Sequence, residues 1–248
     1  MRTWRRNLQF LLNTGDSDMI DGHDYEAAWG SSGALVAALR VRDSYTQLHS
    51  DRVVGLAVEL GVACRLDTHE LFLLKMGACF HDIGKIGIPD QILLKPAELT
   101  DEERTVMRSH PDKGAEIVGQ LFVEGAEGIA TTVRHHHEHY DGEGYPNRLR
   151  GEAIPLYSRM ISLADSYDAM VTRRPYNPGK THEQAIAVIR SEAGSKLDPY
   201  LSRKFLGIID ASDYRIDAWA PTGRRWSHPG LSATIPAGLS PGPGSSAG

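Results

Sequence analysis

Histidines and aspartates stand at several separate places in this chain where their types could support metal chemistry. His81 and Asp82 follow directly on the strongly apolar run of residues 71–80. Burying a carboxylate at such a place costs free energy unless a cation or hydrogen bonds compensate it. His136 and His137 belong to a tract of three consecutive histidines. Mixed imidazole and carboxylate ligands suit iron, manganese or zinc better than magnesium or calcium.

Three further residues complete the candidate set. His49 precedes the apolar residues Val53 and Leu56 by four and seven positions, which places it on a buried helix face. Asp165 neighbours the apolar stripe of another helix, and His110 is expected at a helix end. Each residue alone has an ordinary explanation, such as a satisfied core histidine, a capping residue or a solvated histidine patch. Together the seven are too many for one tetrahedral zinc and suit two octahedral ions sharing a bridging carboxylate.

The elements that must position these residues are helices. Apolar residues at three- and four-residue spacing predict helices over roughly 46–63, 68–82, 100–110, 129–137, 156–167, 181–189 and 201–208. Thr68, Thr100 and Thr181 are the expected capping residues. Gly84 should end the second helix, and Pro111 should interrupt the third. No convincing strand alternation or internal repeat is present, so the predicted fold class is all-α.

Composition and punctuation divide the chain into three parts. Residues 1–32 are expected to be an arm or linker remnant, residues 33–209 a helical domain, and residues 210–248 a disordered tail rich in Pro, Gly and Ser. The 248 residues are 41% hydrophobic and 24% charged, which is ordinary for a globular protein. A net charge of -5 argues against binding of a nucleic acid polymer.

Cysteine content and hydropathy bear on location. Cys64 and Cys79 have no CxxC spacing and are expected to be small buried thiols in a reducing compartment. No run approaches the roughly 18 apolar residues of a membrane helix. We therefore expect a cytoplasmic protein without a membrane span.

The candidate residues lie in blocks that resemble the HD-GYP domain family. Residues 81–90 resemble the pattern HDxGKxxIPD, and residues 136–146 match HHExxDGxGYP in full. Further blocks at 92–100, 110–117 and 164–176 keep the family's order, so the resemblance covers roughly residues 33–209. It implies a helical bundle of the HD-domain type with a buried metal centre. It also implies a bacterial signalling enzyme that hydrolyses cyclic di-GMP to the linear dinucleotide pGpG. A second cut would give GMP, and the resemblance leaves open whether this chain makes that cut.

The resemblance also implies roles for individual residues. Asp82 would be the bridging carboxylate, and Lys85 would lie near the scissile phosphate. The loop Gly144-Tyr145-Pro146 would border the substrate groove, while Arg159 and Arg174 are candidate phosphate or guanine contacts and equally ordinary surface arginines. A hydroxide bridging the two metals would attack phosphorus. The implied ligands of two divalent ions, Fe or Mn, are His49, His81, Asp82, His110, His136, His137 and Asp165.

Two positions depart from the family pattern. Tyr45 stands where some members have a glutamate that holds a third metal, so we expect two metals. Asn177 stands where a basic residue often clamps phosphate, although Lys180 could replace it. These departures leave alternatives open: a phosphohydrolase acting on another nucleotide, a non-hydrolytic cyclic-dinucleotide sensor, or an interaction module that docks a diguanylate cyclase through its Gly-Tyr-Pro loop.

Overall fold

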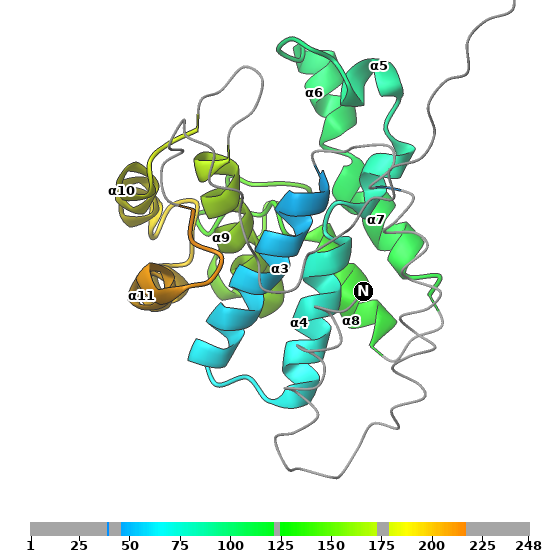
Figure 1. Ribbon diagram of the computed structural model, residues 1–248. Coiled ribbons are helices and arrows are strands. Elements are labelled where there is room, and N and C mark those ends of the chain that lie inside the picture. The colour runs from blue at the N-terminus through cyan, green and yellow to red at the C-terminus, as the bar shows by residue number, and fades with distance from the viewer. Residues whose placement is uncertain (1–38, 40–45, 122–124, 173–178, 217–248) are drawn as a thin grey trace, which may run out of the picture. The chain divides into compact units, whose positions relative to one another are not determined.

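The computed structural model describes residue 39 and residues 46–121, 125–172 and 179–216. This part of the chain is built from helices joined by loops and short 3-10 turns, and it contains no strand (Figure 1). A single isolated bridge pairs Ala193 with Leu197. The all-α prediction is therefore confirmed. None of the helices described is both long and apolar enough to cross a membrane.

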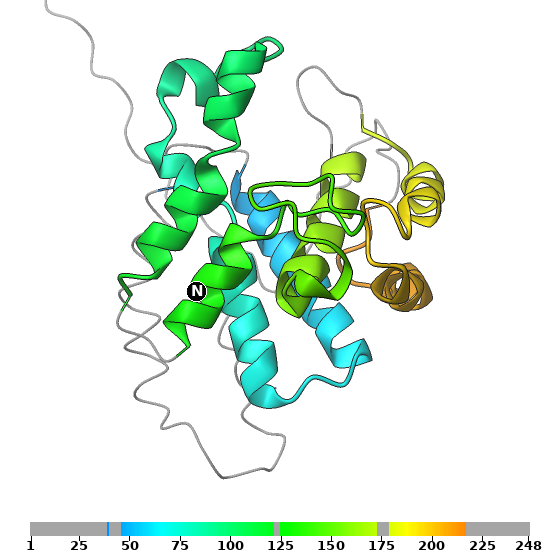
Figure 2. The same cartoon turned by 180° about the vertical axis from the view of Figure 1, so that it is seen from behind.

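The helices form two neighbouring sets, one on each side of the pair α3 and α4. In chain order they are α3 (Thr46–Ala63), α4 (Thr68–Phe80), α5 (Asp90–Leu93), α6 (Asp101–Met107), α7 (His110–Val118), α8 (Ala126–Arg134), α9 (Leu156–Val171), α10 (His182–Glu192) and α11 (Pro199–Ile208). Helices α3 and α4 lie side by side, and α9, α10 and α11 pack on one side of them (Figures 1 and 2). Helices α7 and α8 pack against each other and against the α4 side.

Helix α4 contributes side chains to two hydrophobic cores. Leu74 and Ala78 pack into the core formed with α3, α9, α10 and α11, whereas Met76 and Phe80 pack into the core formed with α7 and α8. A helix buried on opposite faces must be apolar nearly all round. This requirement explains the unbroken apolar run that precedes His81, and it places the end of α4 between the two cores.

Helix starts follow the predicted capping chemistry with one shift. Thr100 and Thr181 each form a complete capping box, accepting a hydrogen bond from the backbone three residues on. At α4 the cap is Asp67 and not Thr68, because the Asp67 carboxylate accepts the backbone N–H of Glu70 and the Glu70 side chain bonds back to Asp67. The capping residue of α4 was therefore predicted one position too late.

Two predicted boundaries around the metal residues are wrong. Helix α4 ends at Phe80, and Gly84 lies inside a 3-10 turn, Ile83–Gly87, instead of ending the helix. A Cβ atom at Gly84 would lie 1.9 Å from the carbonyl oxygen of His110, so glycine is required here for the turn to approach α7. Pro111 lies in the first turn of α7, where its missing N–H is harmless, so it begins a helix and does not interrupt one.

The chain beyond α11 stays in contact with the bundle. A 3-10 turn, Ile209–Ala211, follows directly, and a Cβ atom on Gly55 would lie 2.2 Å from the ring of Tyr214. The His182 ring lies 2.9 Å from Asp210 and 2.8 Å from the Tyr167 hydroxyl. Packed chain therefore continues past residue 209 to 216, whereas the predicted arm, 1–32, and the remainder of the predicted tail lie outside the described residues.

Candidate metal centre

Six of the seven predicted ligands gather in two groups of three. We call His49, His81 and Asp82 the His49 group, and His110, His136 and His137 the His110 group. Within each group the potential ligand atoms all lie within 4.8 Å of one another. Adjacent rings link the two groups, because the centroids of His81 and His136 are 5.4 Å apart. The seventh residue, Asp165, lies with an oxygen 3.3 Å from His49 Nε2.

The ends of three helices position the histidines of this centre. His81 follows α4, His110 lies three residues beyond the last residue of α6, and His136 lies just beyond α8. The last four carbonyls of any helix lack a partner within that helix. His81 Nδ1 lies 2.7 Å from the carbonyl of Ala78, and the other two rings repeat this contact three residues back: His110 Nδ1 lies 2.8 Å from Met107 O and His136 Nδ1 lies 2.6 Å from Val133 O.

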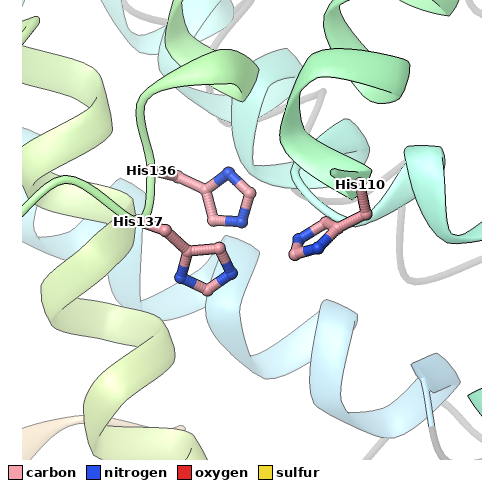
Figure 3. A group of neighbouring side chains, drawn as sticks. All are labelled: His110, His136 and His137. Atoms are coloured by element: carbon pink, nitrogen blue, oxygen red, sulfur yellow. The ribbon is translucent and has the colours of Figure 1, made fainter. Parts of the chain in front are cut away.

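These contacts correct the sequence prediction for the histidine tract. His136 and His137 were placed on a helix that continued from Ile129 and Val133, but α8 ends at Arg134 and both residues lie in the turn that follows. The Val133 carbonyl binds the His136 ring, which helps to satisfy the end of the helix. Figure 3 shows the result: His136 and His137 reach from a loop, and His110 from a helix start, with their rings facing a common space.

The same contacts test whether the site suits a metal ion. When Nδ1 carries the proton and donates it to a carbonyl, Nε2 keeps a free lone pair, which is the form of histidine that ligates metals. The Nε2 atoms of His81, His110 and His136 are buried and have no hydrogen-bond partner. A buried polar atom left unpaired costs about 1–3 kcal/mol. The donor set therefore fits a cation, because a bound cation would satisfy all three nitrogens.

Asp82 belongs to the His49 group and also lies next to the His110 group. Its Oδ1 is 3.4 Å from Nε2 of His110, and its Oδ2 is 3.4 Å from Nε2 of His81 and 2.6 Å from Nζ of Lys85. Burial alone would raise the pKa of Asp82, but Lys85 and the neighbouring histidines hold it well below its usual range. Asp82 is thus an ionised carboxylate with one oxygen toward each group, the geometry that a bridging ligand needs.

His49 is held by a different device. Its Nδ1 lies 2.7 Å from Oδ2 of Asp168, a fully buried carboxylate that is also ion-paired with Arg52. Burial lowers the pKa of His49, but hydrogen bonds to Asp165 and Asp168 outweigh it and raise that pKa to about 9. A carboxylate behind a ligand histidine fixes the ring and raises its basicity.

Burial controls protonation in the His110 group. It lowers the pKa of His136 to about 3, with a further contribution from the nearby His110 and His81 rings. Burial likewise lowers the pKa of His110 and takes that of His137 well below its ordinary value. These three rings are therefore neutral at pH 7 and available as ligands.

The loop after the histidine tract packs directly on the centre. The Tyr145 ring stacks on the His137 ring, with 4.9 Å between the ring centroids. The guanidinium of Arg108 lies over the Tyr145 ring, 5.3 Å from its centroid. A Cβ atom on Gly144 would lie 2.2 Å from the backbone nitrogen of His139, so glycine is required here for the loop to pass close to its own backbone. Pro146 follows through a cis peptide bond. The loop thus forms a wall beside His137.

Of the two candidate arginines, Arg159 does not join this centre. Its guanidinium binds other partners. It lies 2.5 Å from the carboxylate of Asp198, the N-cap residue of α11, and donates a hydrogen bond to the carbonyl of Ile154 at 2.9 Å. Arg159 thus ties the first turn of α9 to α11. Arg174 lies outside the described residues, as do Tyr45 and Asn177.

Sequence reasoning missed the residues that support the ligands. Asp168 and Arg52 each lie three positions after a candidate ligand, Asp165 and His49, so they share a helix face with it, and that spacing could have revealed them. Glu138 was quoted only as part of a motif. Its buried carboxylate accepts the backbone N–H groups of residues 147 and 149 at 2.7 and 3.0 Å and so shapes the loop.

The chain is similar in sequence to two phosphodiesterases of Vibrio cholerae. A cyclic di-GMP phosphodiesterase of Vibrio cholerae is 46% identical over 144 residues, covering 55% of this chain and 29% of that protein. The 3′3′-cGAMP-specific phosphodiesterase 2 of the same organism is 35% identical over 170 residues, covering 67% of this chain and 32% of that protein. The chain therefore spans about a third of the length of these two relatives.

A solved structure and a family profile complete the comparison. The HDG"Y"P protein Bd1817 of Bdellovibrio bacteriovorus superimposes with a TM-score of 0.54 at 19% identity, over 72% of this chain and 57% of that one, which shows a common fold. The sequence profile of the HD domain family matches residues 35–201. This chain belongs to the HD domain family.

Proposed function

We propose that the chain is a metal-dependent phosphodiesterase that hydrolyses cyclic di-GMP, and that residues 33–209 form the responsible domain. The observation that carries the proposal is the set of three buried, unpaired Nε2 atoms around one ionised carboxylate. The relative named as a cyclic di-GMP phosphodiesterase supports the substrate. We further propose pGpG as the first product, because cutting one of two phosphodiesters opens the ring.

We propose that two divalent ions, Fe or Mn, bind here. The His49 group with Asp165 would hold one ion, and the His110 group the other, with Asp82 between them. Imidazole nitrogen mixed with carboxylate oxygen favours these metals. Divalent cations in such sites activate water for attack and offset the negative charge of a phosphate group.

The protein's own groups orient and neutralise the substrate. The ammonium of Lys85 lies at the edge of the centre, 2.6 Å from Asp82, where its charge would stabilise the phosphoryl oxygens as negative charge builds on them. Asp168 and the three helix-end carbonyls hold the histidine rings in ligand orientation. Tyr145, stacked on His137, would exclude water from one side of the reacting phosphate.

The test combines metal content with turnover. His81→Ala and Asp82→Ala should abolish hydrolysis of cyclic di-GMP and reduce bound metal in protein purified without oxygen. Lys85→Ala should retain the metal and lose rate, since the Lys85 ammonium has no lone pair with which to ligate a metal ion. His69→Ala, an exposed residue in the first turn of α4, is the matched control and should change neither quantity. Near-normal turnover in the His81 or Asp82 variant would refute the proposed roles.

A mixed cyclic dinucleotide is the second candidate substrate. The relative that is specific for 3′3′-cGAMP is the observation that favours it. Chromatography of products from cyclic di-GMP, 3′3′-cGAMP and cyclic di-AMP, each at the same concentration, would rank the three. The same chromatograms would separate pGpG from GMP. Tight binding of all three without any product would instead support a sensor.

A further inference from the structure

A cavity opens beside the metal centre on the side of α9. Its volume is about 260 Å³, and its lining includes His137 and Asp165 from the centre. Two lysines, Lys180 and Lys196, line the same cavity. The proposed mechanism gives Lys196 no role. The cavity therefore joins the candidate metal ligands to a second, positively charged wall.

The main chain holds Lys196 firmly at this place. Lys196 lies in the turn between α10 and α11, and its carbonyl accepts the backbone N–H of Tyr140 at 3.1 Å. The neighbouring carbonyl of Ser195 accepts the N–H of Asp141 at 2.8 Å. Residues 140 and 141 belong to the loop that follows the histidine tract. Lys196 is thus anchored to the segment that also carries His136 and His137.

The charge of Lys196 is only weakly offset by its neighbours. The nearest carboxylate oxygen, on Glu192, lies 4.0 Å from Nζ, the outer limit of an ion pair, and the side chain is 39% exposed. His139 lines the cavity as well, and its pKa is lowered first by burial and then by the charge of Lys196. The Lys180 backbone is fixed by a 2.7 Å hydrogen bond to the carbonyl of Met170 in α9. This wall of the cavity therefore offers positive charge to a ligand.

We propose that Lys196, assisted by Lys180, binds the phosphate of the cyclic dinucleotide that is not being cut. This inference rests on the proposed function. A cyclic dinucleotide carries two phosphodiester groups on opposite sides of one ring, each with a single negative charge. When one group lies at the metal centre, the ring fixes how far away the other lies. A lysine on a flexible stem is suited to meet such a charge.

The size of the cavity is consistent with this placement. Pockets that enclose a small ligand usually measure about 300–1,000 Å³. A cavity of about 260 Å³ accepts the phosphate and part of the sugar, while the bases extend beyond it. The two charged walls would therefore select for the spacing of the phosphates more than for the identity of the bases.

The test compares a substrate that has a second phosphate with one that does not. Bis(p-nitrophenyl) phosphate contains a single phosphodiester group. In Lys196→Gln, the ratio of kcat/KM for cyclic di-GMP to that for bis(p-nitrophenyl) phosphate should fall about tenfold, the loss of one charge-assisted hydrogen bond. The change should lie in KM for cyclic di-GMP, and Lys196→Arg should restore most of it. Lys204→Gln, whose side chain lies over Tyr200 on α11, is the matched control and should leave the ratio unaltered.

The possible outcomes distinguish failure of the Lys196 subsite from failure of the proposed phosphodiesterase function. If the natural protein hydrolyses both substrates and Lys196→Gln leaves the ratio unchanged, the subsite is refuted and the proposed function stands. An equal loss on both substrates would mean that Lys196 supports the fold, which also refutes the subsite. If the natural protein hydrolyses neither, the proposed function fails. Calorimetric titration with cyclic di-GMP then decides the subsite, because Lys196→Gln should weaken binding about tenfold, and equal affinity would overturn it.

Discussion

The two groups of the metal centre share one kind of partner and differ in another: helix-end carbonyls orient histidines in both groups, but only the His49 group also uses a buried side-chain carboxylate. In the His49 group, a side-chain carboxylate, Asp168, fixes the His49 ring and is itself held by Arg52. In the His110 group, main-chain carbonyls at helix ends orient His110 and His136. The first arrangement raises the pKa of its histidine to about 9, and the second leaves a ring whose pKa is lowered to about 3.

This difference predicts which kind of change disrupts each group. A group supported by a buried charge pair can be disrupted by one side-chain substitution, because removal of one partner leaves the other charge buried. A group supported by carbonyls has no such partner to remove. It can be disturbed only by moving the backbone or by forcing a proton onto a buried ring. The following predictions address these three vulnerabilities.

The largest effect is expected from Asp168→Asn. The substitution keeps the shape of the side chain but leaves the Arg52 guanidinium without its carboxylate, and breaking a buried pair in this way costs about 3–5 kcal/mol. Urea unfolding should show a loss of this size, and the metal content should fall to that of the His110 group alone. Glu116→Gln, at an exposed position on α7, is the control and should cost under about 0.5 kcal/mol. A loss for Asp168→Asn as small as that of the control would mean that the charge pair does not support the His49 group.

The next effect tests the backbone of the His110 group. In Gly84→Ala the added Cβ would meet the His110 carbonyl oxygen, a backbone atom 1.9 Å away that cannot rotate aside. We expect a loss of about 3 kcal/mol, the upper end of the usual cost of overpacking. The control is Gly128→Ala in α8, where a Cβ meets nothing within 4 Å and alanine should stabilise the helix slightly. Equal unfolding midpoints for the two variants would contradict the close approach of this turn to α7.

The smallest effect concerns pH and is measured on metal-free protein. His136 has a pKa of about 3 when folded and about 6.5 when unfolded. Between these values the unfolded state binds more protons, so the free energy of unfolding must fall as pH falls through this window. From pH 7 to 5 the loss attributable to His136 is about 2 kcal/mol.

Urea unfolding at pH 7, 6 and 5 would measure this dependence, and two variants would assign it. His136→Gln should make the dependence shallower by about that amount, with His110 and His137 still contributing, whereas His69→Gln, at an exposed position, should leave it as in the natural protein. Over this range the ion-paired aspartates stay ionised in both states. His49, whose pKa is raised on folding, adds a slope of opposite sign near its unfolded pKa, and this slope is common to all the variants compared. A slope that survives unchanged in His136→Gln would show that other groups carry it.

Much of the fold could be predicted from the sequence because its helices are amphipathic. The three- and four-residue spacing of apolar residues gave α3, α9 and α11 with nearly correct limits, and the Ser/Thr capping pattern located two helix starts. The order of the motifs also predicted that the candidate ligands lie together. The structure brings six of the seven into two groups of three and places Asp165 next to His49.

The parts that could not be predicted depend on contacts between distant segments. Nothing in the spacing near Val133 says that α8 stops at Arg134, because the end is set by where the His136 ring binds a carbonyl. Arg159 has the composition of a phosphate contact, but its partner, Asp198, is 39 residues away along the chain. The need for glycine at position 84 arises from α7, a separate helix. Periodicity reports which face of a helix is buried and not which residue it meets.

The helix-end histidines also bear on how such a centre could be built anew. Each of these rings uses one nitrogen to finish the helix before it and presents the other outward with its tautomer already chosen. No auxiliary side chain has to be carried along with them. A designer could therefore graft these three ligands onto another scaffold by aiming three helix termini at one point, and substitutions around them would leave the donor nitrogens in place.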